Sequence, residues 1–304
     1  MIDQHSDKHI DYQHINYQHI DYQHIDVTPH NSAMGAEINA GRLDVPLAPA
    51  VIGEIRRAWL AYGLIVFRDQ SLSTPGYARF CEQFGALDSY PFATPTDEHA
   101  RVYPIIKEPD QAFNFGGGWH TDTSYLVQPP AATCLMALEV PAHGGDTLFA
   151  NTTAAFEAMS PAMQALTQDL NGVFTPALVH GNSGAFAHLR QGSASTPDAE
   201  EVALATQRVE HPIIRTHPQT GRKAIYAAAG HCECLADMTV EESQPILNYL
   251  QTQATKPEFT TRLSWQPGTL AMWDNRCVFH YALNDYPGQR REMRRVTLRG
   301  EVPV

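Results

Sequence analysis

Beyond Phe84, short β-rich runs alternate with glycine and proline, and this pattern limits the fold of the chain more than any other feature. The runs cover 133–138, 146–150, 213–215, 224–227, 269–273 and 295–299. Two helical stretches interrupt them, at 151–169 and 239–255. Many short strands separated by turns are typical of a closed or double-sheet β architecture rather than of βαβ units. We therefore predict a mainly β fold with flanking helices, a double-stranded β-helix or jelly roll.

The segment before Phe84 has a different pattern. Residues 47–62 place apolar side chains at helical spacing, and the apolar run 63–67 that follows predicts a strand. A second helix is expected over 73–84, with Ser73 or Thr74 as its N-cap and Pro75 at its first position. No glycine-rich phosphate-binding motif follows a strand, so a nucleotide-binding domain is not indicated.

The N-terminal segment is a repeat, HIDYQ or HINYQ, that recurs about every five residues between His9 and Asp26. This period matches neither the 3.6 residues of a helix nor the 2.0 of a strand, so it specifies no buried face. We predict that 1–25 is a low-complexity, disordered segment and that 26–304 is one domain. The histidines of the repeat can bind metal opportunistically.

Composition narrows the class of partner and the compartment. The net charge is −12, which argues against nucleic acid, but a few arginines in one pocket can still bind a small anion. No apolar stretch reaches the ~20 residues of a membrane span, and no secretory signal is visible. The cysteines number five, too few and odd for a disulfide framework. We expect a cytoplasmic protein with no membrane partner.

Trp119-His120-Thr121-Asp122 places an imidazole and a carboxylate two residues apart. On an extended strand these side chains point to the same face and can reach one ion. With a third ligand they would form the two-histidine, one-carboxylate set that leaves positions on iron(II) open for a bidentate cosubstrate and O2. Among 15 histidines, however, a structural pair of this kind is an equally good interpretation.

The C-terminal region strengthens the metal hypothesis. His280 follows the segment 273–276, and Arg291 and Arg295 come after it. Two guanidiniums downstream of a metal histidine can bind two anionic groups, because the planar fork grips carboxylates and sulfonates bidentately. The alternative is a solvated basic strand at the end of the chain.

With these motifs, the chain resembles the taurine dioxygenase family, which also contains the 2,4-dichlorophenoxyacetate, dichlorprop and alkylsulfate dioxygenases. The likeness spans about 26–303. It is carried by four ordered blocks: WHTDTSYLVQPPAA at 119–132, GGDTLFAN at 144–151, HPIIRTHPQTGRKAIY at 211–226 and WDNRCVFHYALNDYPGQRREMRR at 273–295. The resemblance implies an iron(II)- and 2-oxoglutarate-dependent dioxygenase that consumes O2. It also implies a homo-oligomer, a dimer or a tetramer.

The family's site residues fall on matching positions. The resemblance implies that His120, Asp122 and His280 bind iron, that Thr147 contacts a carboxylate of 2-oxoglutarate and that Arg291 pairs with its distal carboxylate. Relatives that halogenate have a small residue in place of the carboxylate ligand, so Asp122 favours hydroxylation.

The substrate positions depart from the taurine enzyme. Arg295 falls on the arginine that meets the substrate sulfonate there. Tyr90 and Ala93 replace a histidine and a tyrosine, and glycines at 116–118 lie near the position of an asparagine. We therefore expect a bulkier or more apolar small anion, such as a sulfonate, a sulfate ester or an aryloxy or alkyl carboxylate. The glycines belong either to a lid over the site or to a tight turn.

Two other functions use the same residues. A zinc hydrolase could bind its metal with this set but would need a general base and would have no use for Thr147 or Arg291. A non-catalytic jelly-roll binding protein would need neither the intact ligand set nor both arginines. A soft-metal site at 231–234 (HCEC) is disfavoured because no second ligand pair accompanies it.

Overall fold

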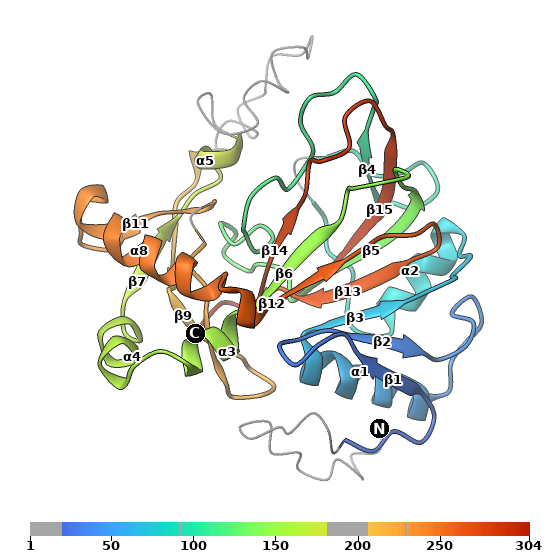
Figure 1. Cartoon of the computed structure of the whole chain (residues 1–304), viewed down its shortest axis with the longest axis horizontal. Coiled ribbons are helices and arrows are strands. Elements are labelled where there is room, and N and C mark those ends of the chain that lie inside the picture. The colour runs from blue at the N-terminus through green and yellow to red at the C-terminus, as the bar shows by residue number, and fades with distance from the viewer. Residues whose placement is uncertain (1–19, 91–92, 181–205, 229) are drawn as a thin grey trace.

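The computed structural model describes residues 20–90, 93–180, 206–228 and 230–304, and two β-sheets form its centre (Figure 1). The larger sheet has seven strands in the order β1-β2-β3-β13-β5-β15-β4, and the smaller has the order β12-β6-β14. Neighbours in both sheets are antiparallel except β2 and β3. Two mostly antiparallel sheets that share one core, with helices packed outside them, confirm the predicted mainly β, jelly-roll fold.

The strands of the larger sheet are β1 (Asp26–Pro29), β2 (Ala36–Asn39), β3 (Leu64–Phe67), β4 (Tyr103–Lys107), β5 (Ala132–Glu139), β13 (Leu270–Asp274) and β15 (Arg291–Leu298). Those of the smaller sheet are β6 (Thr147–Asn151), β12 (Thr260–Leu263) and β14 (Val278–Ala282). The predicted runs 133–138, 146–150, 269–273 and 295–299 fall on strands of these two sheets, and the runs 213–215 and 224–227 fall on a separate two-stranded sheet. The run 295–299 is the exception in length, because β15 begins four residues earlier than expected.

Side chains alternate between two cores along each strand of the larger sheet. Leu64 and Val66 of β3 pack in the core between the sheets, together with Phe149 of β6. Ile65 and Phe67 point the other way, into the core beneath the helices. A strand with both faces covered reads as an unbroken apolar run, which is why 63–67 shows no polar alternation.

The same alternation decides the environment of the arginines on β15. Met293 belongs to the core between the sheets, whereas Val296 and Leu298 belong to the outer core. Arg291 and Arg295 have the parity of Met293, and only 6% and 3% of their surfaces are exposed. The two arginines therefore lie between the sheets, and the interpretation as a solvated basic strand is wrong.

Helices α1 (Pro49–Tyr62) and α2 (Thr74–Glu82) cover the outer face of the larger sheet, on the right-hand side of Figure 1. Helix α1 ends at Gly63, whose φ of 69° lets its N–H donate to the carbonyl of Trp59. The side chain of Ser73 accepts a hydrogen bond from the Gly76 N–H and caps α2, as predicted.

A second group of elements packs against the opposite side of the smaller sheet, at the left of Figure 1. Its helices are α3 (Thr152–Glu157), α4 (Pro161–Thr167), α5 (Ala177–His180), α8 (Val240–Ala254) and the 3₁₀ turn η3 (Pro257–Phe259). Its strands are β7 (Asn171–Phe174), β8 (Val209–Pro212), β9 (Ile214–Thr216), β10 (Lys223–Ile225) and β11 (Cys232–Leu235). Thr239 and Glu242 form a capping box at the start of α8.

The single helix expected over 151–169 is wrong, because the chain forms α3 and α4 instead. Pro161 lacks an N–H and its ring clashes with the carbonyl four residues earlier, which favours a helix break at this position. Ser160 accepts a hydrogen bond from the Met163 N–H and begins a new helix there.

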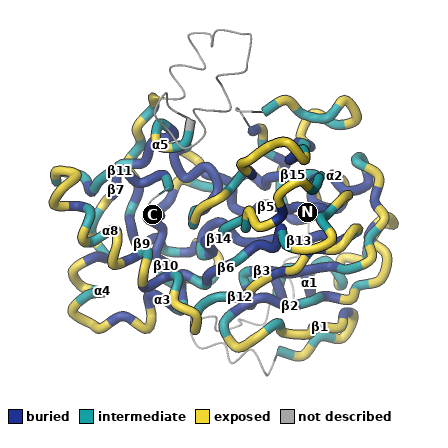
Figure 2. Tube along the Cα trace, turned by 45° about the horizontal axis from the view of Figure 1, so that its top comes forward, coloured by how far each residue is buried: buried dark blue, intermediate teal, exposed yellow. Residues whose placement is uncertain are grey.

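Burial is densest along the strands, and exposed residues lie mainly in the loops and at the outer helices (Figure 2). Packing begins before Asp26, since Ile25 is buried and the backbone N–H groups of Gln23 and His24 donate to the Glu54 carboxylate. Most of the five-residue repeat lies outside the described residues, as do the predictions made for it. Within the described ranges, no helix combines the length and the apolarity required to cross a bilayer.

Candidate active site

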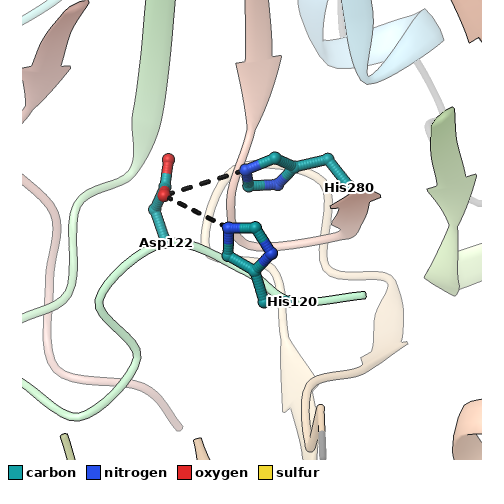
Figure 3. A group of neighbouring side chains, drawn as sticks. All are labelled: His120, Asp122 and His280. Carbon is teal, nitrogen blue, oxygen red and sulfur yellow. Dashed lines mark ion pairs between the residues drawn. The ribbon is translucent and has the colours of Figure 1, made fainter. Parts of the chain in front are cut away.

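Three side chains point toward one another between the two sheets (Figure 3). The Oδ1 atom of Asp122 lies 3.8 Å from Nε2 of His120 and 3.7 Å from Nε2 of His280. One ligand atom from each residue falls within 4.8 Å of the others, a spacing that fits a single metal ion. The structure thus brings together the three residues that the motif analysis selected.

Backbone pairing sets this arrangement. His280 lies on β14, and His120 forms an isolated antiparallel bridge with it. The His120 N–H donates to the His280 carbonyl at 3.1 Å, and the His280 N–H donates back at 2.8 Å. Residues 160 positions apart in the sequence are thereby fixed side by side.

The expectation that His120 and Asp122 share an extended strand is wrong. His120 makes a single bridge, and the chain then turns, with Thr123 in the left-handed region at a φ of 44°. The Thr121 hydroxyl donates to the carbonyl of Asn275 at 2.7 Å. A turn anchored to the loop after β13, and not strand alternation, brings Asp122 beside His120.

The protonation of the triad suits a divalent metal. Nδ1 of His120 is 2.7 Å from the Gly118 carbonyl, which can only accept, so the proton is on Nδ1 and Nε2 keeps its lone pair. Burial lowers the pKa of His120 and, more strongly, that of His280. Burial alone would raise the pKa of Asp122, but the Arg295 guanidinium, together with the hydrogen bond from Thr133, outweighs it and holds that pKa well below its ordinary value. Two neutral imidazoles and one carboxylate form the donor set of non-haem iron(II) sites.

A cavity of about 40 Å³, hereafter the inner cavity, lies between the sheets beside the triad. Its wall includes Thr147 of β6, Trp273 of β13 and Arg291 of β15. The indole N–H of Trp265 donates to the Thr147 hydroxyl at 2.9 Å. Because the hydroxyl oxygen accepts there, the proton of Thr147 remains for an acceptor in the cavity.

Arg291 offers buried donors to the inner cavity. Its guanidinium lies 5.7 Å from the centre of the Trp265 ring, and burial lowers its pKa. Among the described residues, its Nε and Nη2 atoms have no hydrogen-bond partner. Leaving a buried charged donor unpaired is costly, so this site fits an anionic group such as the distal carboxylate of 2-oxoglutarate.

Trp265 is a site residue that the sequence analysis did not select. It stands 118 positions from Thr147, and no motif spacing connects the two. The register of β12 and β6, in which Leu263 is opposite Thr147, brings it there.

Arg295 borders both the inner cavity and a larger one. Its Nη2 atom is 3.1 Å from Oδ1 of Asp122, and its guanidinium lies 4.7 Å from the centre of the Tyr90 ring. Tyr90 in turn packs edge-on against Phe115, at 6.3 Å between ring centres. The structure thus places Arg295 and Tyr90 together beside the triad.

The larger cavity, hereafter the outer cavity, has a volume of about 480 Å³. Six aromatic side chains dominate its wall: Tyr90, Phe113, Phe115, Trp119, Tyr125 and Tyr281. Ala93, which the sequence analysis placed among the substrate positions, does not line it. The outer cavity is therefore an aromatic-walled space with a cation, Arg295, next to the metal triad.

The glycines at 116–118 form a turn that is tied to β14. The Gly116 carbonyl accepts hydrogen bonds from the N–H groups of Gly118 and Ala282. Gly116 has a φ of 82°, and a Cβ there would lie 3.3 Å from Cε1 of His120. Of the two interpretations of this run, these contacts favour the tight turn.

A second grouping of metal-binding residue types, His217, Asp274 and Cys277, is structural. Nδ1 of His217 accepts from the backbone N–H groups of Gln219 and Thr220, and its Nε2 donates to Asp274 at 3.0 Å. Both imidazole nitrogens are therefore occupied. The cysteines at 232 and 234 belong to neither of the two groupings that the described residues form.

Comparison with known proteins adds independent findings. Residues 23–297 match the model of the "Taurine catabolism dioxygenase TauD, TfdA family". An alkylsulfatase of Acinetobacter baylyi is 32% identical, and the match covers 88% of this chain and 83% of that protein. An alpha-ketoglutarate-dependent sulfate ester dioxygenase of Pseudomonas putida is also 32% identical, with 91% and 90% covered.

Solved structures agree with these relatives. The crystal structure of a taurine dioxygenase from Burkholderia xenovorans has a TM-score of 0.77 and 32% identity, and the match covers 93% of each chain. The structure of AAD-2 in complex with Mn(II) and N-oxalylglycine has a TM-score of 0.74 and 26% identity, with 92% of this chain and 98% of that one covered.

Proposed function

The chain belongs to the TauD, TfdA family of 2-oxoglutarate-dependent dioxygenases, and from this premise we propose that it hydroxylates a small organic anion: a sulfonate, a sulfate ester or an aryloxy acid. The observation that carries the proposal is the position of Arg295. Its guanidinium is buried, borders the outer cavity and lies next to the triad. An anionic group bound there would hold the neighbouring carbon of the substrate close to the metal.

In this proposal His120, Asp122 and His280 bind iron(II), and Thr147 and Arg291 bind 2-oxoglutarate. When bound, iron(II) with 2-oxoglutarate and O2 supplies the oxidising power that places a hydroxyl group on a substrate carbon, with succinate and CO2 as coproducts. The Gly118 carbonyl holds the His120 ring in the tautomer that presents Nε2.

The remaining residues bind and orient. Trp265 directs the Thr147 hydroxyl into the inner cavity, and Arg291 supplies the charge that a dicarboxylate needs at its far end. Arg295 binds the anionic group of the substrate, while the aromatic wall of the outer cavity excludes water around an apolar body. Hydroxylation of the carbon that bears the anionic or aryloxy group gives a product that collapses and releases sulfite, sulfate or a phenol.

A substrate screen tests the proposal. Purified protein with iron(II), 2-oxoglutarate and O2 is assayed for succinate against alkyl sulfonates, alkyl sulfate esters and phenoxyalkanoates. We expect one class to stimulate succinate formation and to yield its released group in equal amount. The same release with zinc in the absence of O2 and 2-oxoglutarate would instead indicate a hydrolase. If no anion stimulates succinate formation above the substrate-free rate, the proposed substrate class is wrong.

A further inference from the structure

We propose that Thr133 and Asn275 are positioning residues that orient the Asp122 carboxylate and thereby set the affinity of the metal site. Thr133 lies on β5, and Asn275 lies in the loop between β13 and β14. The inference rests on the proposed metal site. It assigns a role to two residues outside the triad and outside both anion-binding positions.

The hydrogen bonds between these residues have a single direction. The Thr133 hydroxyl lies 2.5 Å from Oδ2 of Asp122, and Nδ2 of Asn275 lies 2.9 Å from the same hydroxyl oxygen. An ionised carboxylate can only accept, so the one proton of Thr133 goes to Asp122. The hydroxyl oxygen must then accept from Asn275, and the amide must present its NH2 group.

The pair is held in a rigid setting. Thr133 is fully buried, and 2% of Asn275 is exposed. The Asn275 N–H donates to the Ala131 carbonyl at 2.9 Å, and the Asn275 carbonyl accepts from the Thr121 hydroxyl at 2.7 Å. The loop after β13 is thus bonded to both sides of the segment that carries Asp122.

Arg276 and Asp274 make the same loop stiffer. Both Nε and Nη2 of Arg276 donate to the Asp274 carboxylate at 2.7 Å, and His217 donates to it at 3.0 Å. Buried charges that are paired in this way leave Asn275 little freedom to move.

The consequence is a difference between the two oxygens of Asp122. Oδ2 is engaged by Thr133, whereas Oδ1 faces both imidazoles. Oδ1 is also 3.1 Å from Arg295, which competes for the carboxylate whenever the carboxylate is free to rotate. The Thr133–Asn275 pair opposes that rotation and presents one oxygen to the metal.

The test is an anaerobic titration of the full-length protein with iron(II), and with manganese(II) as a redox-stable probe, followed by calorimetry. Thr133→Val removes the hydroxyl at constant shape, and we expect it to weaken metal binding by about 10- to 100-fold, the usual effect of losing an outer partner of a metal ligand. Thr133→Ser restores the hydroxyl and should bind within about 3-fold of the wild type, as expected if the bond to Asp122 and not side-chain volume matters. Asn275→Ala should weaken metal binding more than Thr133→Ser does and less than Thr133→Val does.

A matched control separates positioning from stability. Thr167 is equally buried, and its hydroxyl donates to the Met163 carbonyl in α4, away from the site. Thr167→Val should leave metal affinity unchanged. Equal losses in both valine variants would overturn the inference, as would wild-type affinity in Thr133→Val. If Thr133→Val does not fold, wild-type affinity in Asn275→Ala overturns it. A wild-type protein that binds neither metal refutes the proposed metal site itself, which is a different result.

Discussion

The inner and outer cavities meet at the triad but are built from different parts of the chain. The inner cavity, of about 40 Å³, takes its wall largely from strands of the two sheets. The outer cavity, of about 480 Å³, is walled mainly by loop residues at 113–119, 122–125 and 230–231. Strand residues cannot shift without changing the register of a whole sheet, whereas loops tolerate substitution. The residues proposed to bind 2-oxoglutarate, Thr147 and Arg291, therefore lie on strands, whereas most of the wall proposed to surround the substrate lies on loops, which tolerate substitution more easily.

Among the described residues that border both cavities, Arg295 is the one on a strand, and it also contacts Asp122. If 2-oxoglutarate binds in the inner cavity and the substrate in the outer cavity, a variant in one cavity should weaken the binding of one of these ligands and not of the other. Variants of the triad should affect both.

The largest effect is expected for Asp122→Ala. This change removes the one anionic ligand and leaves Arg295 without its partner, and removing one member of a buried pair costs about 3–5 kcal/mol. Turnover should fall at least 100-fold, that is by about 3 kcal/mol or more in barrier. Substrate-dependent succinate release measures the turnover, and the metal content of the variant measures the loss of the ligand. Wild-type turnover would remove Asp122 from the ligand set.

Arg291→Ala should weaken ligand binding in the inner cavity alone. The KM for 2-oxoglutarate is expected to rise about 10- to 100-fold, the effect of losing a charged hydrogen bond of ~1.5–3 kcal/mol, while the substrate KM stays within about 3-fold. Arg290→Ala is the matched control, because its guanidinium pairs with Glu108 and Glu139 at the surface. Parallel increases in both KM values would contradict this separation of the two ligands.

Arg295→Ala should have the opposite pattern. The substrate KM is expected to rise about 10-fold or more, whereas the KM for 2-oxoglutarate changes little. Because Arg295 also contacts Asp122, the metal content of the variant is measured in the same preparation. If both ligands lose affinity equally in a fully metal-loaded variant, Arg295 does not act as the substrate anchor.

The smallest effect is expected for Trp265→Phe, which keeps the ring beneath Arg291 and removes the indole donor to Thr147. Losing one neutral hydrogen bond of about 1 kcal/mol should raise the KM for 2-oxoglutarate by about 3- to 10-fold. Substrate-dependent kinetics at saturating 2-oxoglutarate should match the wild type. No change in the KM for 2-oxoglutarate would show that Thr147 does not depend on Trp265 for its orientation.

Much of the secondary structure was predictable because its signals are local. Strand runs, the Ser73 cap and the helix over 239–255 depend on neighbouring residues. The error at 151–169 was also local, because Ser160 and Pro161 together are a helix start signal within this segment. The error at His120 was of another kind, since a β-bridge to His280 and a turn replaced the expected strand.

By itself, the sequence determined which residue types carry the chemistry and which of them share one face of a strand. His120, Asp122, His280, Arg291 and Arg295 stand in motifs, and a four-residue spacing on a strand puts both arginines on one face. Which face is interior depends on what packs against it, so only the tertiary structure decided that these arginines are buried. Strand register likewise placed Trp265 beside Thr147, and the packing of strand β5 against the loop after β13 placed Thr133 and Asn275 behind Asp122. Contacts of this kind join residues far apart in the chain, and no local pattern encodes them.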